Sequence, residues 1–108
     1  MKAFQSGINE LRNKVAAIDA ELVLISPPPF DQLPVRSELV DEDAPEFGYR
    51  TPYKGYDQVL GDYANWLNSL KGEKLHVIDL HTKMNESIAK EREEYSIFTY
   101  ARDGIHPN

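Results

Sequence analysis

The strongest constraint on the fold is a short apolar run that three consecutive prolines end. Residues 21–26 (ELVLIS) are predicted to form a strand whose apolar residues follow one another without polar alternation, which is typical of a strand covered on both faces. The prolines at 27–29 end this strand because proline cannot donate to a hydrogen-bond ladder. Residues 75–79 (LHVID) predict a second, short strand. The chain is therefore expected to bury two β-strands.

Three helical patterns surround these strands. Apolar side chains recur at helical spacing over residues 3–18, 55–70 and 80–94, as in Phe4, Ile8, Leu11, Val15 and Ile18. Strands joined through helices are parallel, so the order predicts an α/β fold. Sheets usually have about four to six strands, and parallel sheets are covered on both faces. Two strands therefore predict an incomplete portion of a domain, or a chain that pairs with another.

Residues 27–53 form the long Pro-rich loop of the sequence. They hold six of the seven prolines and the acidic stretch 41–46, and show no periodicity. A connection of this length without secondary structure is uncommon in a compact domain and is usually functional or mobile. Two interpretations stay open. The loop is either a solvated surface excursion or a substrate-facing flap that carries Phe30, Phe47, Tyr49 and Tyr53.

Composition excludes several classes of function. A length of 108 residues fits one domain, and 41% apolar with 28% charged residues is ordinary for a globular protein. The net charge of −6 argues against nucleic-acid or anionic-membrane binding, which needs a basic surface. The absence of cysteine excludes disulfides and thiolate sites. No apolar run is long enough for a transmembrane segment, and the cellular compartment stays open.

The last six residues, DGIHPN, contain the candidate catalytic pair. Asp103 precedes His106 by three positions, on a loop in which Gly104 permits a sharp turn and Pro107 stiffens the exit. Asp103 is then able to accept the Nδ1–H of His106, which leaves Nε2 outward as a general base. The alternative is an ordinary loop histidine beside a turn-forming aspartate.

The hexapeptide resembles the final conserved segment of the SGNH, or GDSL, hydrolase family. The resemblance extends upstream to residues 22–29 as a strand with a proline-rich exit, to 56–70 as the next helix, and to 77–80 as the next strand and its exit. It implies a three-layer α/β/α sandwich with a flavodoxin-like parallel sheet. It also implies a carboxylic-ester hydrolase, of the esterase, lipase or acetylesterase class, in which Asp103 and His106 are the acid and base of a catalytic triad.

The same resemblance shows what this chain does not contain. The family's serine nucleophile, in a Gly-Asp-Ser segment, and its glycine and asparagine oxyanion donors have no counterpart here; Ser6 and Ser26 do not match. Residues 1–108 are therefore expected to be the C-terminal part of one SGNH-like domain, inactive alone. Its expected partners are an acyl ester of a small molecule or carbohydrate, and the missing N-terminal part or another chain. The second hypothesis is a non-catalytic α/β module that pairs with another chain through its unpaired strand and the aromatic loop at 47–56.

The remaining polar candidates have simpler interpretations. His76, Asp79 and His81 have the residue types of a metal site, but Asp79 as a helix cap beside two ordinary histidines is the favoured interpretation. No metal and no cofactor are therefore expected. Trp66, on the flank of the apolar face of residues 55–70, is expected to pack and not to bind a ligand, and residues 90–94 are expected to form a solvated helix end. Arg102 is expected to lie at the surface; the alternative is that it helps to place an anionic or sugar substrate near His106.

Overall fold

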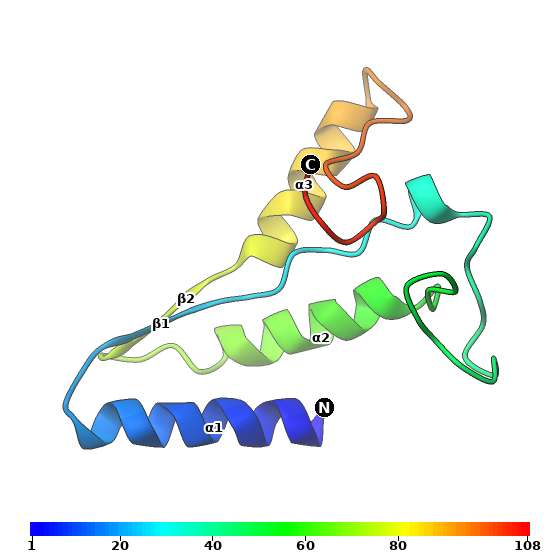
Figure 1. Cartoon of the computed structure of the whole chain (residues 1–108). Helices are drawn as coiled ribbons and strands as arrows, with labels where there is room; N and C mark the ends of the chain where they lie inside the picture. Colours follow the sequence, from blue (N-terminus) through cyan, green and yellow to red (C-terminus); the bar gives the residue numbers. More distant parts are fainter.

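The computed structural model describes all 108 residues (Figure 1). The elements in chain order are α1 (Lys2–Ala17), β1 (Leu22–Ile25), the short 3₁₀ helix η1 (Leu33–Val35), α2 (Tyr56–Asn68), β2 (Leu75–Ile78) and α3 (Leu80–Arg92). Each predicted helix and strand is confirmed, with ends that differ by no more than two residues.

The two strands form one parallel sheet. Leu22 pairs with Leu75 and Ile25 pairs with Ile78, and α2 makes the connection between the strands. This is the βαβ arrangement that the order of the patterns predicts, because a parallel pair needs a crossover. The protein is therefore a small α/β fold.

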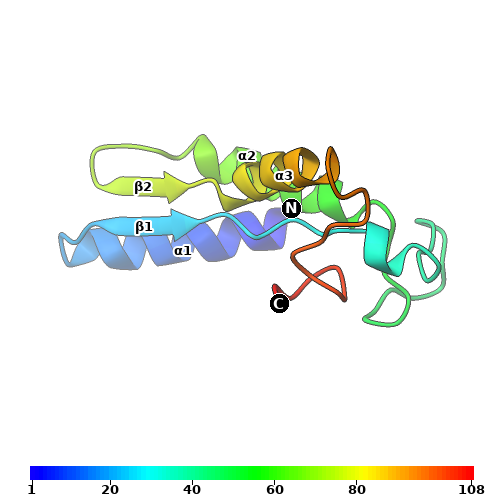
Figure 2. The ribbon, with the colours of Figure 1, turned by 90° about the horizontal axis from the view of Figure 1, so that it is seen from above.

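Helices α1 and α2 lie together on one side of the sheet (Figures 1 and 2). The ring of Phe4 in α1 stacks on Tyr63 in α2, with ring centroids 4.1 Å apart, and Trp66 meets the same Phe4 ring edge-on. Trp66 is therefore a packing residue, as expected. The aromatic contact joins the two helices into a single layer.

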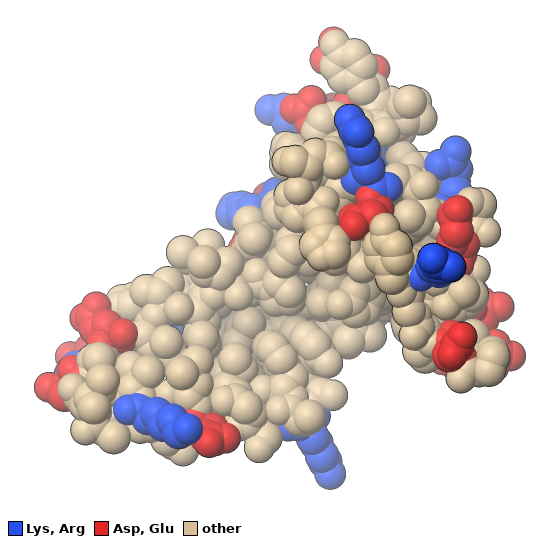
Figure 3. All heavy atoms as spheres, viewed as in Figure 1, with Lys and Arg blue, Asp and Glu red and all other residues tan.

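The opposite face of the sheet is open. Val23, Ile25 and Ile78 are 54%, 59% and 51% exposed, and in Figure 2 no helix lies in front of the two strands. In the view of Figure 3, in which the sheet lies edge-on, few charged side chains lie over the middle of the molecule. The expectation that both faces of residues 21–26 are covered is therefore wrong for this chain. An apolar strand sequence favours burial of both faces of the sheet, whereas α1 and α2 cover only one of them. A three-layer sandwich stays a prediction.

The core is small and lies where the sheet, α2 and α3 meet. Its main buried side chains are Leu24, Leu60, Ala64, Leu67 and Ile88. Phe30, after the exit of β1, and Ala101, in the C-terminal loop, are also buried. None of the helices is both long and apolar enough to cross a membrane.

The Pro-rich loop 27–53 is held at several points instead of being wholly irregular. It contains η1, and Val40 forms a parallel bridge with Tyr53 through the bonds Val40 N–H to Pro52 (3.0 Å) and Lys54 N–H to Val40 (3.0 Å). Lys54 also pairs with Asp41. The loop is thereby fastened to the segment that leads into α2.

Candidate functional site

The site begins where β1 ends, at Ser26. This residue is 1% exposed, and its Oγ accepts a hydrogen bond from the His81 backbone N–H at 3.0 Å. The hydroxyl also lies 3.4 Å from a carboxylate oxygen of Asp79, which caps α3 by accepting from the Thr82 N–H at 3.0 Å. Ser26 therefore joins the ends of the two strands, and its burial excludes it as a nucleophile at the C-terminal loop.

Asp57, in the first turn of α2, fixes the backbone that follows the prolines. Its Oδ1 accepts from the Phe30 N–H at 2.8 Å and lies 2.9 Å from His81 Nε2. Its Oδ2 accepts from the Asn85 side chain at 3.2 Å. The carboxylate thus connects the exit of β1 to α2 and α3.

Asp31, the residue after Phe30, forms the most deeply buried ion pair in the protein, with Arg92. Its side chain is 5% exposed, and the Arg92 guanidinium donates to both carboxylate oxygens at 2.8 and 2.7 Å. The Thr99 hydroxyl donates to the same carboxylate, and Arg92 Nε donates to the Phe98 carbonyl at 2.8 Å. This network ties the last turn of α3 to the exit of β1 and to the start of the C-terminal loop.

Gly104 brings the C-terminal loop against this anchored segment. The Asp31 N–H donates to the Gly104 carbonyl at 2.8 Å, and Gly104 has φ +82°. A Cβ at Gly104 would lie 2.6 Å from the Asp31 carbonyl oxygen and 2.9 Å from the Phe30 ring. Only glycine therefore allows both the left-handed turn and this close approach.

Asp103 and His106 lie on the turn that Gly104 makes. His106 Nδ1 is 2.7 Å from Asp103 Oδ2, while Asp103 Oδ1 accepts from the N–H groups of Ile105 and His106 at 2.9 and 2.8 Å. The carboxylate therefore holds both the backbone and the ring of the histidine. The His106 side chain is 76% exposed, and Nε2 has no protein partner.

The electrostatics of the pair fix the histidine tautomer. The hydrogen bond from the His106 ring, followed by the two backbone N–H groups, lowers the pKa of Asp103 from 3.8 to about 2. Asp103 is therefore ionised at neutral pH and only accepts, so Nδ1 must carry the proton. Nε2 of the neutral ring is then a free, solvent-facing base.

The histidines at 76 and 81 do not form a metal site with Asp79. His76 lies 3.5 Å from Glu21 across the open side of the sheet, and His81 contacts Asp57. No group of three or more potential ligands comes together. Burial raises the pKa of Asp79, but hydrogen bonds from Thr82, Asn68 and Ser26 outweigh it and hold the pKa below its ordinary value. Asp79 is a helix cap, as the favoured interpretation stated.

Sequence reasoning missed the residues that hold the loop in place. The interpretation of residues 90–94 as a solvated helix end is wrong for Arg92, which is the partner of buried Asp31. Asp57 and His81 were likewise not expected to meet. No local spacing predicts these contacts because the paired residues are 61 and 24 positions apart. Arg102 is exposed, as expected.

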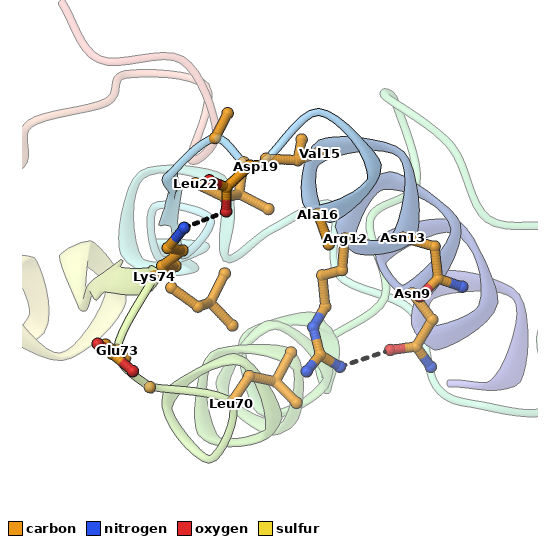
Figure 4. Close-up of a pocket in the computed structure, with 13 residues that line it drawn as sticks. Asn9, Arg12, Asn13, Val15, Ala16, Asp19, Leu22, Leu70, Glu73 and Lys74 are labelled. Atoms are coloured by element: carbon orange, nitrogen blue, oxygen red, sulfur yellow. Dashed lines mark hydrogen bonds and ion pairs between the residues drawn. The ribbon is translucent and has the colours of Figure 1, made fainter.

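A separate hollow lies at the opposite end of the sheet (Figure 4). It measures about 650 Å³, and its lining includes Arg12, Leu22, Leu70 and the ion pair of Asp19 with Lys74. It faces the end at which the strands begin. Ligands of open α/β sheets bind beyond the carboxyl ends of the strands, where the Asp103–His106 loop lies. We therefore place the candidate site at that loop.

No protein-family model, curated protein or solved structure matches this chain. The candidate site therefore depends on the geometry of its residues and on the resemblance of the DGIHPN segment.

Proposed function

We propose that this chain supplies the acid and base of a serine-dependent carboxylic-ester hydrolase of the SGNH type. The observation that carries the proposal is the 2.7 Å contact between Asp103 and His106, on a loop that leaves His106 Nε2 free. In this role His106 takes the proton of the attacking serine and later returns it to the leaving alcohol. Asp103 holds the reactive tautomer and stabilises the imidazolium.

The nucleophile and the oxyanion donors belong to a part of the enzyme outside these 108 residues. Ser26 is buried and Ser6 lies in α1. In Figure 1, α2 lies between α1 and the C-terminal loop. In damaged triads the residual acceleration comes largely from the oxyanion hole and substrate binding. A chain without those donors is therefore inert alone. The missing segments are also the source of the further strands and of the third layer.

The open sheet face and the free strand edges support this proposal and also support the alternative. In the hydrolase, the N-terminal part of the same domain covers Val23, Ile25 and Ile78. In the alternative, a non-catalytic α/β module binds another chain over the same face, and the Asp103–His106 pair is a turn. The substrate class within the hydrolase proposal is an acyl ester, with an O-acetylated carbohydrate favoured over a long acyl chain.

The test is ester hydrolysis by the longer protein that carries this chain together with a Gly-Asp-Ser segment. His106→Ala and Asp103→Asn should each lower kcat by roughly 10³-fold or more, because triad members act as a unit. Lys90→Ala, at an exposed position of α3, is the control and should leave the rate unchanged. Wild-type rates in both triad variants would overturn the assignment and leave the binding module as the better hypothesis.

A further inference from the structure

An apolar hollow of about 360 Å³ lies beside the His106 loop and has no assigned role. We call it the aromatic hollow; its lining residues are Phe47, Gly48, Pro52, Tyr53, Tyr56 and Ile105. It joins three parts of the chain that are distant in sequence: the end of the Pro-rich loop, the first residue of α2 and the C-terminal loop.

The aromatic walls are held by specific contacts. Tyr53 is fixed by its bridge to Val40, and its ring packs so closely on Gly55 that a Cβ there would lie 2.5 Å from the ring. The rings of Phe47 and Tyr53 are in contact, with centroids 5.2 Å apart, and the ring of Tyr56 contacts that of buried Phe30, with centroids 5.5 Å apart. The hollow is thus a built feature of the loop, whereas Tyr49 on the same loop is 72% exposed and takes no part in it.

The lining determines which chemical group fits. No charged side chain borders the hollow, and three of its six residues present aromatic rings. Uncharged aromatic walls favour a neutral ring whose face or edge can lie against them; between aromatic rings, stacked and edge-on arrangements are preferred. An apolar cavity of about 150 Å³ is enough for benzene, so the volume accommodates one six-membered ring with room for substituents.

The hollow and the candidate catalytic pair are connected through Ile105. Ile105 forms part of its wall, and the Ile105 N–H is bonded to the same carboxylate oxygen that holds the His106 N–H. A ring in the hollow therefore lies against the residue that precedes the base. We infer that the aromatic hollow is the subsite for a neutral six-membered ring of the ester substrate, an inference that rests on the proposed function.

The experiment is an NMR titration of the 108-residue chain with three neutral probes: benzyl alcohol, methyl β-glucopyranoside and 1-hexanol. At least one ring compound should shift the Tyr53, Tyr56 and Ile105 signals saturably, with 1-hexanol binding more weakly. The ring that binds identifies an aryl ester or a sugar ester as the source. Phe47→Ala should weaken that binding about two- to tenfold, which is the range for one aromatic contact. Gly55→Ala, which displaces the Tyr53 ring, should also weaken it.

Tyr49→Ala is the matched control and should leave the binding constant unchanged. The inference is overturned if neither ring compound binds or if 1-hexanol binds as tightly as the ring compounds. It is also overturned if Phe47→Ala leaves the binding constant unchanged while its amide spectrum shows that the variant is folded. His106→Ala separates this inference from the proposed function. If the 108-residue chain binds the ring and the longer protein still hydrolyses esters with His106→Ala, the proposed function is refuted and the subsite is not. If His106→Ala abolishes hydrolysis in the longer protein but the 108-residue chain does not bind the ring, the subsite is refuted and the proposed function is not.

Discussion

At the residue scale, the Asp103 carboxylate is held by three donors that all come from the next three residues. Because its pKa falls from 3.8 to about 2 in the folded chain, its stabilising effect is complete above pH 3.8. That effect is lost as the pH falls through about 2. The hydrogen bonds that hold the ring and backbone of His106 to Asp103 should therefore persist at pH 3 and be lost near pH 2.

The His106 ring makes the largest contribution to this low pKa. In His106→Ala, the pKa of Asp103 should rise from about 2 toward 3.8 without reaching it, because the two backbone N–H donors remain. A ¹³C NMR titration of the Asp103 carboxyl measures the change. Arg102→Ala should leave the midpoint where it is. An unchanged midpoint in His106→Ala would mean that the side-chain hydrogen bond is not made in solution.

Gly104 offers a second prediction at this scale. Gly104→Ala places a methyl group 2.6 Å from the Asp31 carbonyl at a positive φ, so unfolding should become easier by at least about 1 kcal/mol. Gly7→Ala is the matched control, since Gly7 lies within α1 with open space around it. That substitution should stabilise the chain by up to about 1 kcal/mol. Urea denaturation measures both changes, and equal effects of the two would contradict the strained turn.

At the element scale, local sequence patterns predicted the three α-helices and the two strands, because those patterns repeat or end within a few residues, whereas the 3₁₀ helix η1 in the Pro-rich loop was not predicted. The Asp103–His106 pair was predictable for the same reason, since three positions separate its members. The anchors of the loop were not. Asp31 meets Arg92 only after the whole βαβα arrangement has formed, and nothing in the run 90–94 distinguishes a buried arginine from its solvated neighbours.

The last turn of α3 carries the corresponding prediction. Arg92→Met leaves the carboxylate of Asp31 buried without the guanidinium that donates to both of its oxygens, which should cost about 3 kcal/mol of unfolding free energy. Lys90→Met, on the same turn and exposed, should change stability by less than about 0.5 kcal/mol. Adding Asp31→Asn to Arg92→Met should recover part of the loss, because no charge is then left buried. Denaturation curves of the four proteins provide the test, and similar costs for the two single variants would remove the anchor role.

At the scale of the whole molecule, one face of the sheet is buried against the helices and the other face is exposed. Leu24 is 8% exposed against the helices, whereas its neighbour Ile25 is 59% exposed on the other face. Leu24→Thr should therefore cost at least about 2 kcal/mol, from lost burial and an unpaired hydroxyl. Ile25→Thr keeps a β-branched residue on an exposed face and should cost less than about 0.5 kcal/mol.

The same two substitutions distinguish the proposed hydrolase from the alternative module. In a longer hydrolase chain whose own segments cover this face, Ile25→Thr should become about as costly as Leu24→Thr at every protein concentration. For a module that binds another chain, the cost of Ile25→Thr should appear only when the partner is added and should grow with partner concentration, since binding stabilises by mass action. Thermal unfolding at two or more protein concentrations measures the difference. A cost for Ile25→Thr that stays below about 0.5 kcal/mol in both settings would mean that the open face of the sheet is not a buried surface in either form.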